Sequence, residues 1–216
     1  MTFKQARDEY WKYYISLEKQ FVETGRYVEF DYINNGKTYS MEYLKLYQAV
    51  CSEIDVVGKV LASIVDPTFR PTKDTGINEW WYHIYSVEPT IEGENCSLFG
   101  EQTLQPWKRF KVVKNPNPGA KKYILDDVNK AKTPSWWTDY NSVKHNRTGI
   151  YQKHSTNYAK ANLRNLFYAF SALFILDVKL MEKHRVSKET IPVEFESKLF
   201  TDQLSFYTYL LSVKEK

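Results

Sequence analysis

The run from residue 158 to about residue 183 constrains the fold more than any other part of the chain. Its apolar residues recur at spacings of three and four, which is the repeat of an α-helix. In the middle of the run they cover nearly the whole circumference of that helix, so other elements must surround it. We therefore expect a mainly α protein, a helical bundle with this run as its central helix. The apolar residues are Leu163, Leu166, Phe167, Phe170, Leu173, Phe174 and Met181.

Three other stretches have the same helical repeat. We expect amphipathic helices over residues 3–23 and 40–65, the second with Ser40 as its N-cap, and a short helix over 77–85. Gly58 lies on the apolar stripe of the second helix, which indicates the close approach of another helix. His83, in the third, is assigned to packing.

Two regions lack this repeat. Residues 26–39 alternate weakly around the turn signal Asn34-Asn35-Gly36, which favours a short hairpin or an extended crossing. Residues 88–127 hold four of the eight prolines, and we interpret them as an irregular, β-containing insertion that acts as a lid or a substrate-facing flap. Within it, 104–113 is expected to form an edge strand or hairpin arm. Residues 186–196 are predicted to be a loop, and 199–213 a closing helix or edge strand.

Length and composition indicate one domain, 1–216. A chain of 216 residues with 43% hydrophobic content is long enough for one sizeable core. Its two cysteines predict neither a disulfide framework nor a zinc site. The N-terminus lacks the apolar stretch of a signal peptide, and no apolar run is long enough to span a bilayer. We therefore expect a cytoplasmic protein with no membrane partner.

Charge is unevenly distributed along the chain. The net charge is only +4, but residues 106–164 hold 13 Lys and Arg against 3 Asp and Glu. Such a local excess of positive charge favours a polyanionic partner such as RNA. A solvated basic surface without a ligand is the simpler alternative.

Polar, titratable and aromatic residues crowd together within this basic segment. Tyr140, Asn141, Lys144, His145 and Arg147 fall within eight positions. In a helix over 135–146, Asn141, Lys144 and His145 share one face, because they are spaced i, i+3 and i+4. An amide, an ammonium and an imidazole together suit a site that holds a phosphate and moves a proton. In the alternative interpretation, His145 caps or packs at the helix end and its basic neighbours complement the helix dipole.

The segment Tyr140-Asn-Ser-Val-Lys-His145 resembles the motif of the HEPN superfamily, helical domains of which many are metal-independent endoribonucleases. The family pattern is an Arg, then a polar residue that is often Asn, then a short spacer ending in His. This chain keeps Asn141 and His145 at that spacing, adds Lys144, and has Tyr140 where the family has Arg. A second register, Arg147 followed by His154, also lies within the family's spacing. The resemblance covers about residues 136–154.

The resemblance implies roles for these residues. His145, or His154 in the second register, would transfer protons during RNA cleavage, while Lys144 and Arg147 hold the phosphate and Asn141 orients the imidazole or the ribose. Further candidates for contacting the substrate are Tyr140, Lys153 and Trp137, although Trp136 and Trp137 are also typical core residues. Glu53 is a candidate for orienting Lys144 or His145.

The expected function is therefore metal-independent RNA cleavage, with no cofactor and no metal. The resemblance further implies a homodimer, a toxin or phage-defence role, and an antitoxin or regulatory protein as a possible partner. One alternative is a non-catalytic HEPN-like module that binds RNA, a nucleotide or a protein. A third is a helical adaptor whose basic surface binds an acidic protein.

Overall fold

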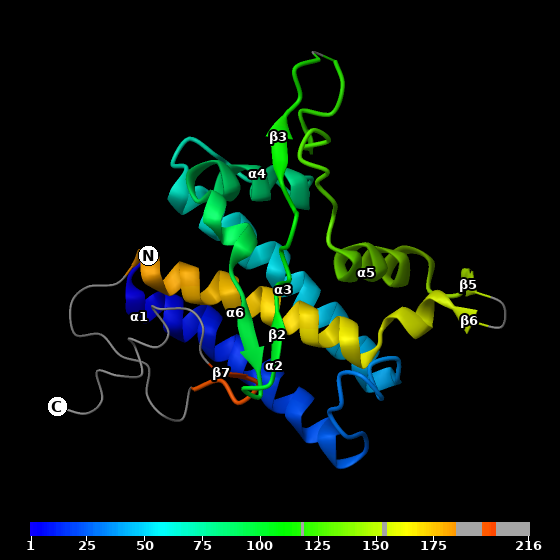
Figure 1. Ribbon diagram of the computed structural model, residues 1–216. Coiled ribbons are helices and arrows are strands. Elements are labelled where there is room, and N and C mark those ends of the chain that lie inside the picture. The colour runs from blue at the N-terminus through cyan, green and yellow to red at the C-terminus, as the bar shows by residue number, and fades with distance from the viewer. Residues whose placement is uncertain (118, 153–154, 185–195, 202–216) are drawn as a thin grey trace.

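The computed structural model describes residues 1–117, 119–152, 155–184 and 196–201, and it is mainly α-helical (Figure 1). The α-helices are α1 (Phe3–Ala6), α2 (Lys12–Glu23), α3 (Met41–Val65), α4 (Ile77–Val87), α5 (Ser135–Asn146) and α6 (Leu163–Lys183). A π-helical turn, Arg7–Trp11, joins α1 to α2, and there are 3-10 turns at Thr24–Arg26, Pro89–Gly93 and Asn157–Lys160.

Short strands supplement the helices. They are β1 (Cys96–Leu98), β2 (Gln102–Leu104), β3 (Val112–Lys114), β4 (Tyr123–Leu125), β5 (Ile150–Gln152), β6 (Ser155–Thr156) and β7 (Phe200–Thr201). All pairings are antiparallel: β2-β1-β7 form one small sheet, and β3-β4 and β5-β6 form two hairpins.

The prediction that the last long helix is central is confirmed. Every residue of α6 from 169 to 178 is buried, and α6 crosses α3 in the middle of the molecule (Figure 1). Ser40 caps α3 as expected, because its hydroxyl accepts a hydrogen bond from the backbone N–H of Tyr43 at 3.1 Å. None of the helices in the described ranges is long and apolar enough to cross a membrane.

The close approach expected at Gly58 is also present. A Cβ added there would lie 2.7 Å from the ring of Trp80, so α4 packs its fully buried indole directly on the backbone of α3. Trp80 also donates a hydrogen bond from its indole N–H to Asp55, at 3.0 Å. Glycine is therefore required at this position by contact and not by backbone conformation.

The start of α6 differs from the prediction. Residues 157–160 form a 3-10 turn, and Ala161 leaves the helical region with φ −78° and ψ 63°. The helix then begins at Leu163, with the side chain of Asn162 accepting a hydrogen bond from the N–H of Asn165 at 3.1 Å. The N-cap at Asn162, and not the apolar repeat from residue 158, therefore determines where α6 begins.

Of the two structures predicted for residues 26–39, a short hairpin or an extended crossing, the hairpin does not form. Instead the carboxylate of Asp31 accepts hydrogen bonds from the backbone N–H groups of Ile33 and Asn34, both at 2.8 Å, and so stabilises a turn. Tyr39 forms only an isolated bridge with Asn162.

The insertion at 88–127 contains β1 to β4, but its expected arm at 104–113 is interrupted. β2 ends at Leu104 and β3 begins at Val112, and the turn between them buries Trp107 and Phe110 against Trp81 of α4. The ring centroids of Trp81 and Trp107 are 4.4 Å apart. Burial of these two rings in the core ends the strand. Of the closing segment predicted for 199–213, only Leu199 to Thr201 lie in the described residues, and there β7 pairs with β1.

Candidate functional site

Helix α5 carries the predicted site, and its inner face anchors it. Trp136, Tyr140 and Val143 recur at spacings of four and three and are buried. The indole N–H of Trp136 donates to the carbonyl of Pro106 at 3.0 Å, and the hydroxyl of Tyr47 donates to the carbonyl of Trp136. These bonds to α3 and to the insertion fix the rotation of α5 about its axis.

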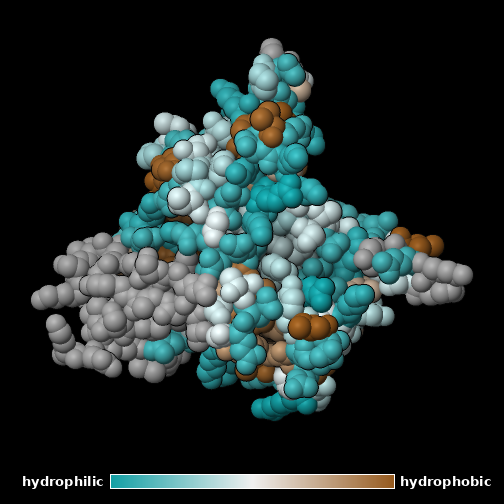
Figure 2. All heavy atoms as spheres, in the orientation of Figure 1, coloured by the Kyte–Doolittle hydropathy of each residue, from teal (hydrophilic) through white to brown (hydrophobic). Residues whose placement is uncertain are grey.

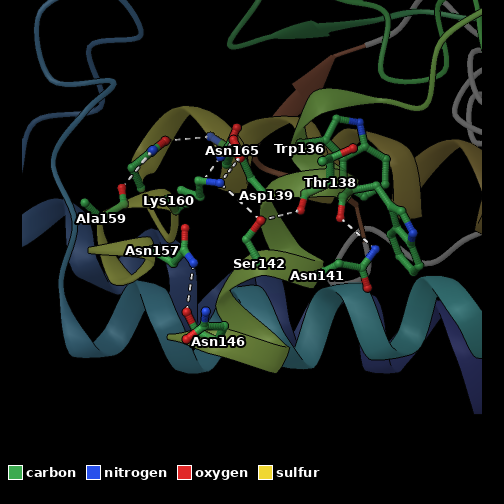
Figure 3. A network of polar contacts seen from close by, with 12 residues as sticks. Trp136, Thr138, Asp139, Asn141, Ser142, Asn146, Asn157, Ala159, Lys160 and Asn165 are labelled. Atoms are coloured by element: carbon green, nitrogen blue, oxygen red, sulfur yellow. Dashed lines mark hydrogen bonds and ion pairs between the residues drawn. The ribbon is translucent and has the colours of Figure 1, made fainter. Parts of the chain in front are cut away.

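A polar network ties the other side of α5 to the start of α6 (Figure 3). Asp139 forms an ion pair with Lys160 at 3.2 Å and accepts a hydrogen bond from the amide of Asn165 at 3.0 Å. Lys160 also donates to the hydroxyl of Ser142 at 3.1 Å. Because both flanks of the helix are held, its exposed residues keep defined positions.

Asn141 and Lys144 line a cleft between α3, α5 and the segment before α4. The cleft has a volume of about 390 Å³. The amide of Asn141 donates to the carbonyl of Trp137 at 3.1 Å, and the Lys144 ammonium lies 5.6 Å from the ring centroid of Tyr140, within cation–π range. The complete lining is Ser52, Asp55, Lys59, Lys73, Thr75, Gly76, Ile77, Trp137, Tyr140, Asn141 and Lys144.

We call this space the lysine cleft, because three lysines line it against one aspartate, a formal charge of +2. Lys59 forms an ion pair with Asp55 at 2.6 Å, so these two charges offset each other. Lys73 and Lys144 are exposed and have no acidic partner in the described part of the chain. The lysine cleft can therefore attract an anion such as a phosphate.

His145 and Arg147 lie at the end of α5, outside the lining of the lysine cleft. Both are exposed. His145 follows Asn141 by four residues, so the two side chains lie about 40° apart around the helix axis. The structure thus brings Asn141, Lys144 and His145 to the exposed side of one helix, as the spacing predicts, while Arg147 follows at the helix C-cap.

Tyr140 and Trp137 are core residues that reach the cleft only at an edge. Their side chains are 5% and 7% exposed, so neither presents an open face for stacking on a base. Burial raises the pKa of Tyr140 to about 12, and the nearby Cys51 and Asp55 act in the same direction. The phenol is therefore neutral and cannot supply the charge of the Arg that the HEPN pattern has at this position.

Lys153 and His154 lie outside the described residues, so the structure places only Arg147 of the second register. The other two histidines, His83 and His184, do not line the lysine cleft. His83 packs as predicted, with its ring hydrogen-bonded to Asp66 at 2.7 Å and to Tyr123 at 3.1 Å. His184 is half-buried just after α6, and burial lowers its pKa.

Glu53, a candidate for orienting Lys144 or His145, lies on another side of α3. Its charge acts on Tyr10 and Asp177, at the contact of α3 with α6 and the π-helical turn, and burial raises its own pKa. Asp55, two positions later and on another side of α3, is the acidic residue that lines the lysine cleft. Ser52, Asp55 and Lys59 recur at spacings of three and four, and this polar repeat in the sequence indicates the side of α3 that lines the lysine cleft.

Across the described residues, no three His, Cys, Asp or Glu side chains are grouped so that they could hold a metal ion. Both cysteines are buried and free, and burial raises the pKa of Cys51 and of Cys96. Neither thiol is poised as a nucleophile.

The chain matches no family model, no curated protein and no solved structure.

Proposed function

We propose that this chain is a metal-independent endoribonuclease of the HEPN type, with its site on the C-terminal half of α5. The observation that carries the proposal is the shared position of three groups. Asn141 and Lys144 line a cleft of positive charge, and His145 lies on the exposed side of the same helix. The mainly helical fold and the Asn141-to-His145 spacing agree with the HEPN resemblance.

The chemistry of RNA cleavage suits these groups. A base takes the proton of the 2′-hydroxyl, an acid protonates the leaving 5′-oxygen, and cations stabilise the charge that develops on the phosphate. His145 is the proton-transfer group, since imidazole exchanges protons near neutral pH. Lys144 and Lys73 hold the phosphate, Arg147 adds charge at the helix end, and Asn141 orients the ribose or the imidazole.

The HEPN resemblance extends the proposal to the assembly and the biological role. A homodimer would place two copies of the motif near one RNA, and a toxin or phage-defence role would require an antitoxin or a regulatory protein. Both are inferred from the resemblance alone.

A second function is favoured by Tyr140. Because this phenol is buried and neutral where the family has Arg, one expected cation is missing from the site. A chain without that charge could bind RNA through the lysine cleft and not cleave it.

The deciding test is cleavage of tRNA, rRNA and mRNA by purified protein in EDTA. We expect wild type to cleave, and His145→Ala to lose activity by about 10²- to 10⁴-fold, the usual contribution of general acid–base catalysis. RNA binding by His145→Ala, measured by fluorescence anisotropy, should stay within a few-fold of wild type. Lys19→Ala, an exposed lysine on α2, is the control.

Three other results would change the conclusion. Loss of cleavage in His154→Ala but not in His145→Ala would move the site to the second register. Wild-type binding without cleavage of any RNA would favour the non-catalytic module. Unchanged cleavage in both histidine variants would contradict the proposal.

A further inference from the structure

A second polar cleft lies on the other side of α5, between residues 36–39, the start of α6 and the β5-β6 hairpin. Its volume is about 330 Å³. Lys37 and Arg164 contribute positive charge to its lining, and Asp139 is the acidic residue there. Since Asp139 is already paired with Lys160, the charge of Lys37 and Arg164 is not neutralised by it. We call this space the arginine cleft.

Arg164 is held in a fixed orientation at this cleft. Its guanidinium lies 4.9 Å from the ring centroid of Tyr32 and donates to the Tyr32 carbonyl at 3.3 Å. A Cβ on Gly36 would lie 2.5 Å from the Tyr32 carbonyl oxygen and 3.1 Å from the Arg164 Nε, so glycine is required by the turn itself and the guanidinium packs against that turn. Contacts with the turn and with the Tyr32 ring therefore hold Arg164 in place.

The guanidinium has hydrogen-bonding capacity to spare. It carries five N–H donors, and one of them, on Nη2, bonds to the Tyr32 carbonyl. The Nε–H is buried against Gly36 without a hydrogen-bond partner in the described part of the chain, so the terminal Nη groups are the donors that can reach a ligand. Lys37 is exposed beside it and forms no ion pair within the described residues. A fixed guanidinium next to a mobile ammonium is an arrangement that suits a phosphate group.

The two clefts flank one exposed helix side. Asn141 lines the lysine cleft and Asp139 lines the arginine cleft, and two residues correspond to about 200° around a helix. Between these two directions, on the solvent side, lie Thr138, Ser142 and His145. Thr138 and His145 are exposed and Ser142 is half-buried, so the described part of the chain leaves the path from one cleft to the other open.

The hydropathy of the surface agrees with a polar ligand. Hydrophilic residues dominate the face seen in Figure 2, and hydrophobic residues form only small separate patches there. The lining of the arginine cleft is itself polar, since Asn162, Asn165, Gln152 and Ser155 contribute to it.

We propose that single-stranded RNA crosses α5, with one phosphate in the lysine cleft, a later one in the arginine cleft and the intervening nucleotides over His145. This inference rests on the proposed function, because it assigns a path to the RNA that His145 would cleave. It adds Lys37 and Arg164 as phosphate-binding residues, from parts of the chain that the HEPN-like segment does not include.

Anisotropy measurements with two labelled oligouridylates test the path, one of about four nucleotides and one of about twelve, which bracket common single-strand site sizes. The parent protein for these measurements is His145→Ala, so that the probe is not cleaved. A second substitution in this parent, Lys37→Ala or Arg164→Gln, should weaken binding of the long probe by about threefold at physiological salt. Each should also lower the slope of log affinity against log salt by about 0.7, the value for one phosphate contact on a single strand. Binding of the short probe should change less, because it can remain in the lysine cleft.

Lys144→Ala and Lys19→Ala separate the possible outcomes, and thermal melting verifies that Arg164→Gln is folded. If Lys144→Ala weakens the long probe while Lys37→Ala behaves like the Lys19→Ala control, the path across α5 is overturned and the proposed RNA site remains. If neither probe binds the parent protein, the proposed function fails as well. An equal loss for both probe lengths in Lys37→Ala would also overturn the path, because it would make the arginine cleft the primary site.

Discussion

At the scale of single residues, Asp177 is a carboxyl group buried without a hydrogen-bond partner in the described structure. It lies on α6 in the core with 1% of its surface exposed, and neither carboxylate oxygen has a hydrogen-bond partner in the described part of the chain. Burial raises the pKa of Asp177 well above its usual value, and the charge of Glu53 raises it further. The folded protein therefore keeps this carboxyl protonated under conditions in which the unfolded chain has released the proton.

This protonation makes stability depend on pH with a definite sign. Because the folded-state pKa is raised, the contribution is fully present below the unfolded pKa of about 3.9 and is lost as pH rises through the folded value. We expect the free energy of unfolding to fall by up to about 1.4 kcal/mol per pH unit for this one proton. Asp177→Asn should remove that part of the slope, as measured by urea unfolding from pH 4 upward.

Asp127→Asn is the matched control, because Asp127 is exposed. Glu53 has a raised pKa too and contributes a slope of the same sign, so some pH dependence should remain in Asp177→Asn. Identical slopes in wild type and Asp177→Asn would show that Asp177 is ionised in the folded protein.

Single-residue predictions from the sequence succeeded where the local pattern determines the environment. Trp136 packs in the core as its apolar surroundings indicate, and His83 packs beside the core, stacked on Phe69. Glu53 could not be placed, because the direction in which a helix carboxylate points depends on which neighbouring helix packs there. That neighbour, α6, lies far away in the sequence.

At the scale of elements, apolar periodicity predicted α3 and α4 with boundaries close to those observed, and α5 forms over the residues where the analysis of the motif took a helix as its premise. The failures have local causes. The cap at Asn162 delays the start of α6, and the Asp31 turn replaces a hairpin. The π-helical turn Arg7–Trp11 shifts the buried stripe by one position, because Ala6 and Trp11, five residues apart, are buried while Tyr10 is only half-buried.

The contact of α4 with α3 at Gly58 should make the protein sensitive to a single added methyl group. Gly58→Ala should gain roughly 1 kcal/mol in helix propensity. It should lose more from overpacking, since the new Cβ would lie 2.7 Å from Trp80, which is fully buried and cannot move away freely. We expect a net destabilisation of about 1–3 kcal/mol in chemical unfolding.

Gly93→Ala is the control for Gly58→Ala, since a Cβ at Gly93 would meet nothing within 4 Å. The double variant Gly58→Ala/Trp80→Phe removes the indole and should recover part of the loss. A single Gly58→Ala variant as stable as wild type would mean that α4 shifts easily on α3.

At the scale of the whole molecule, the sequence indicated the helix on which we propose the site, but not which residues of other elements surround it. The excess of positive charge over residues 106–164 and the spacing of Asn141, Lys144 and His145 both indicated α5. The lysine cleft also needs Lys59 and Lys73, and the arginine cleft needs Lys37. These residues come from other elements, so only the packing of α5 against α3 and α6 brings them together.

The proposed reaction needs two proton-transfer groups, which is more than one copy of α5 supplies. Cleavage requires both a base and an acid, and in the described residues α5 presents one exposed imidazole, that of His145. In the homodimer implied by the HEPN resemblance, His145 of the partner subunit would supply the second imidazole.

Co-expression of equal amounts of wild type and His145→Ala, with separate tags, tests whether activity needs two intact chains. With random pairing, activity per wild-type chain should fall to about half. Light scattering should show the mass of a dimer. Unchanged activity per wild-type chain would instead assign both proton transfers to a single chain, with His154 as the next residue to substitute.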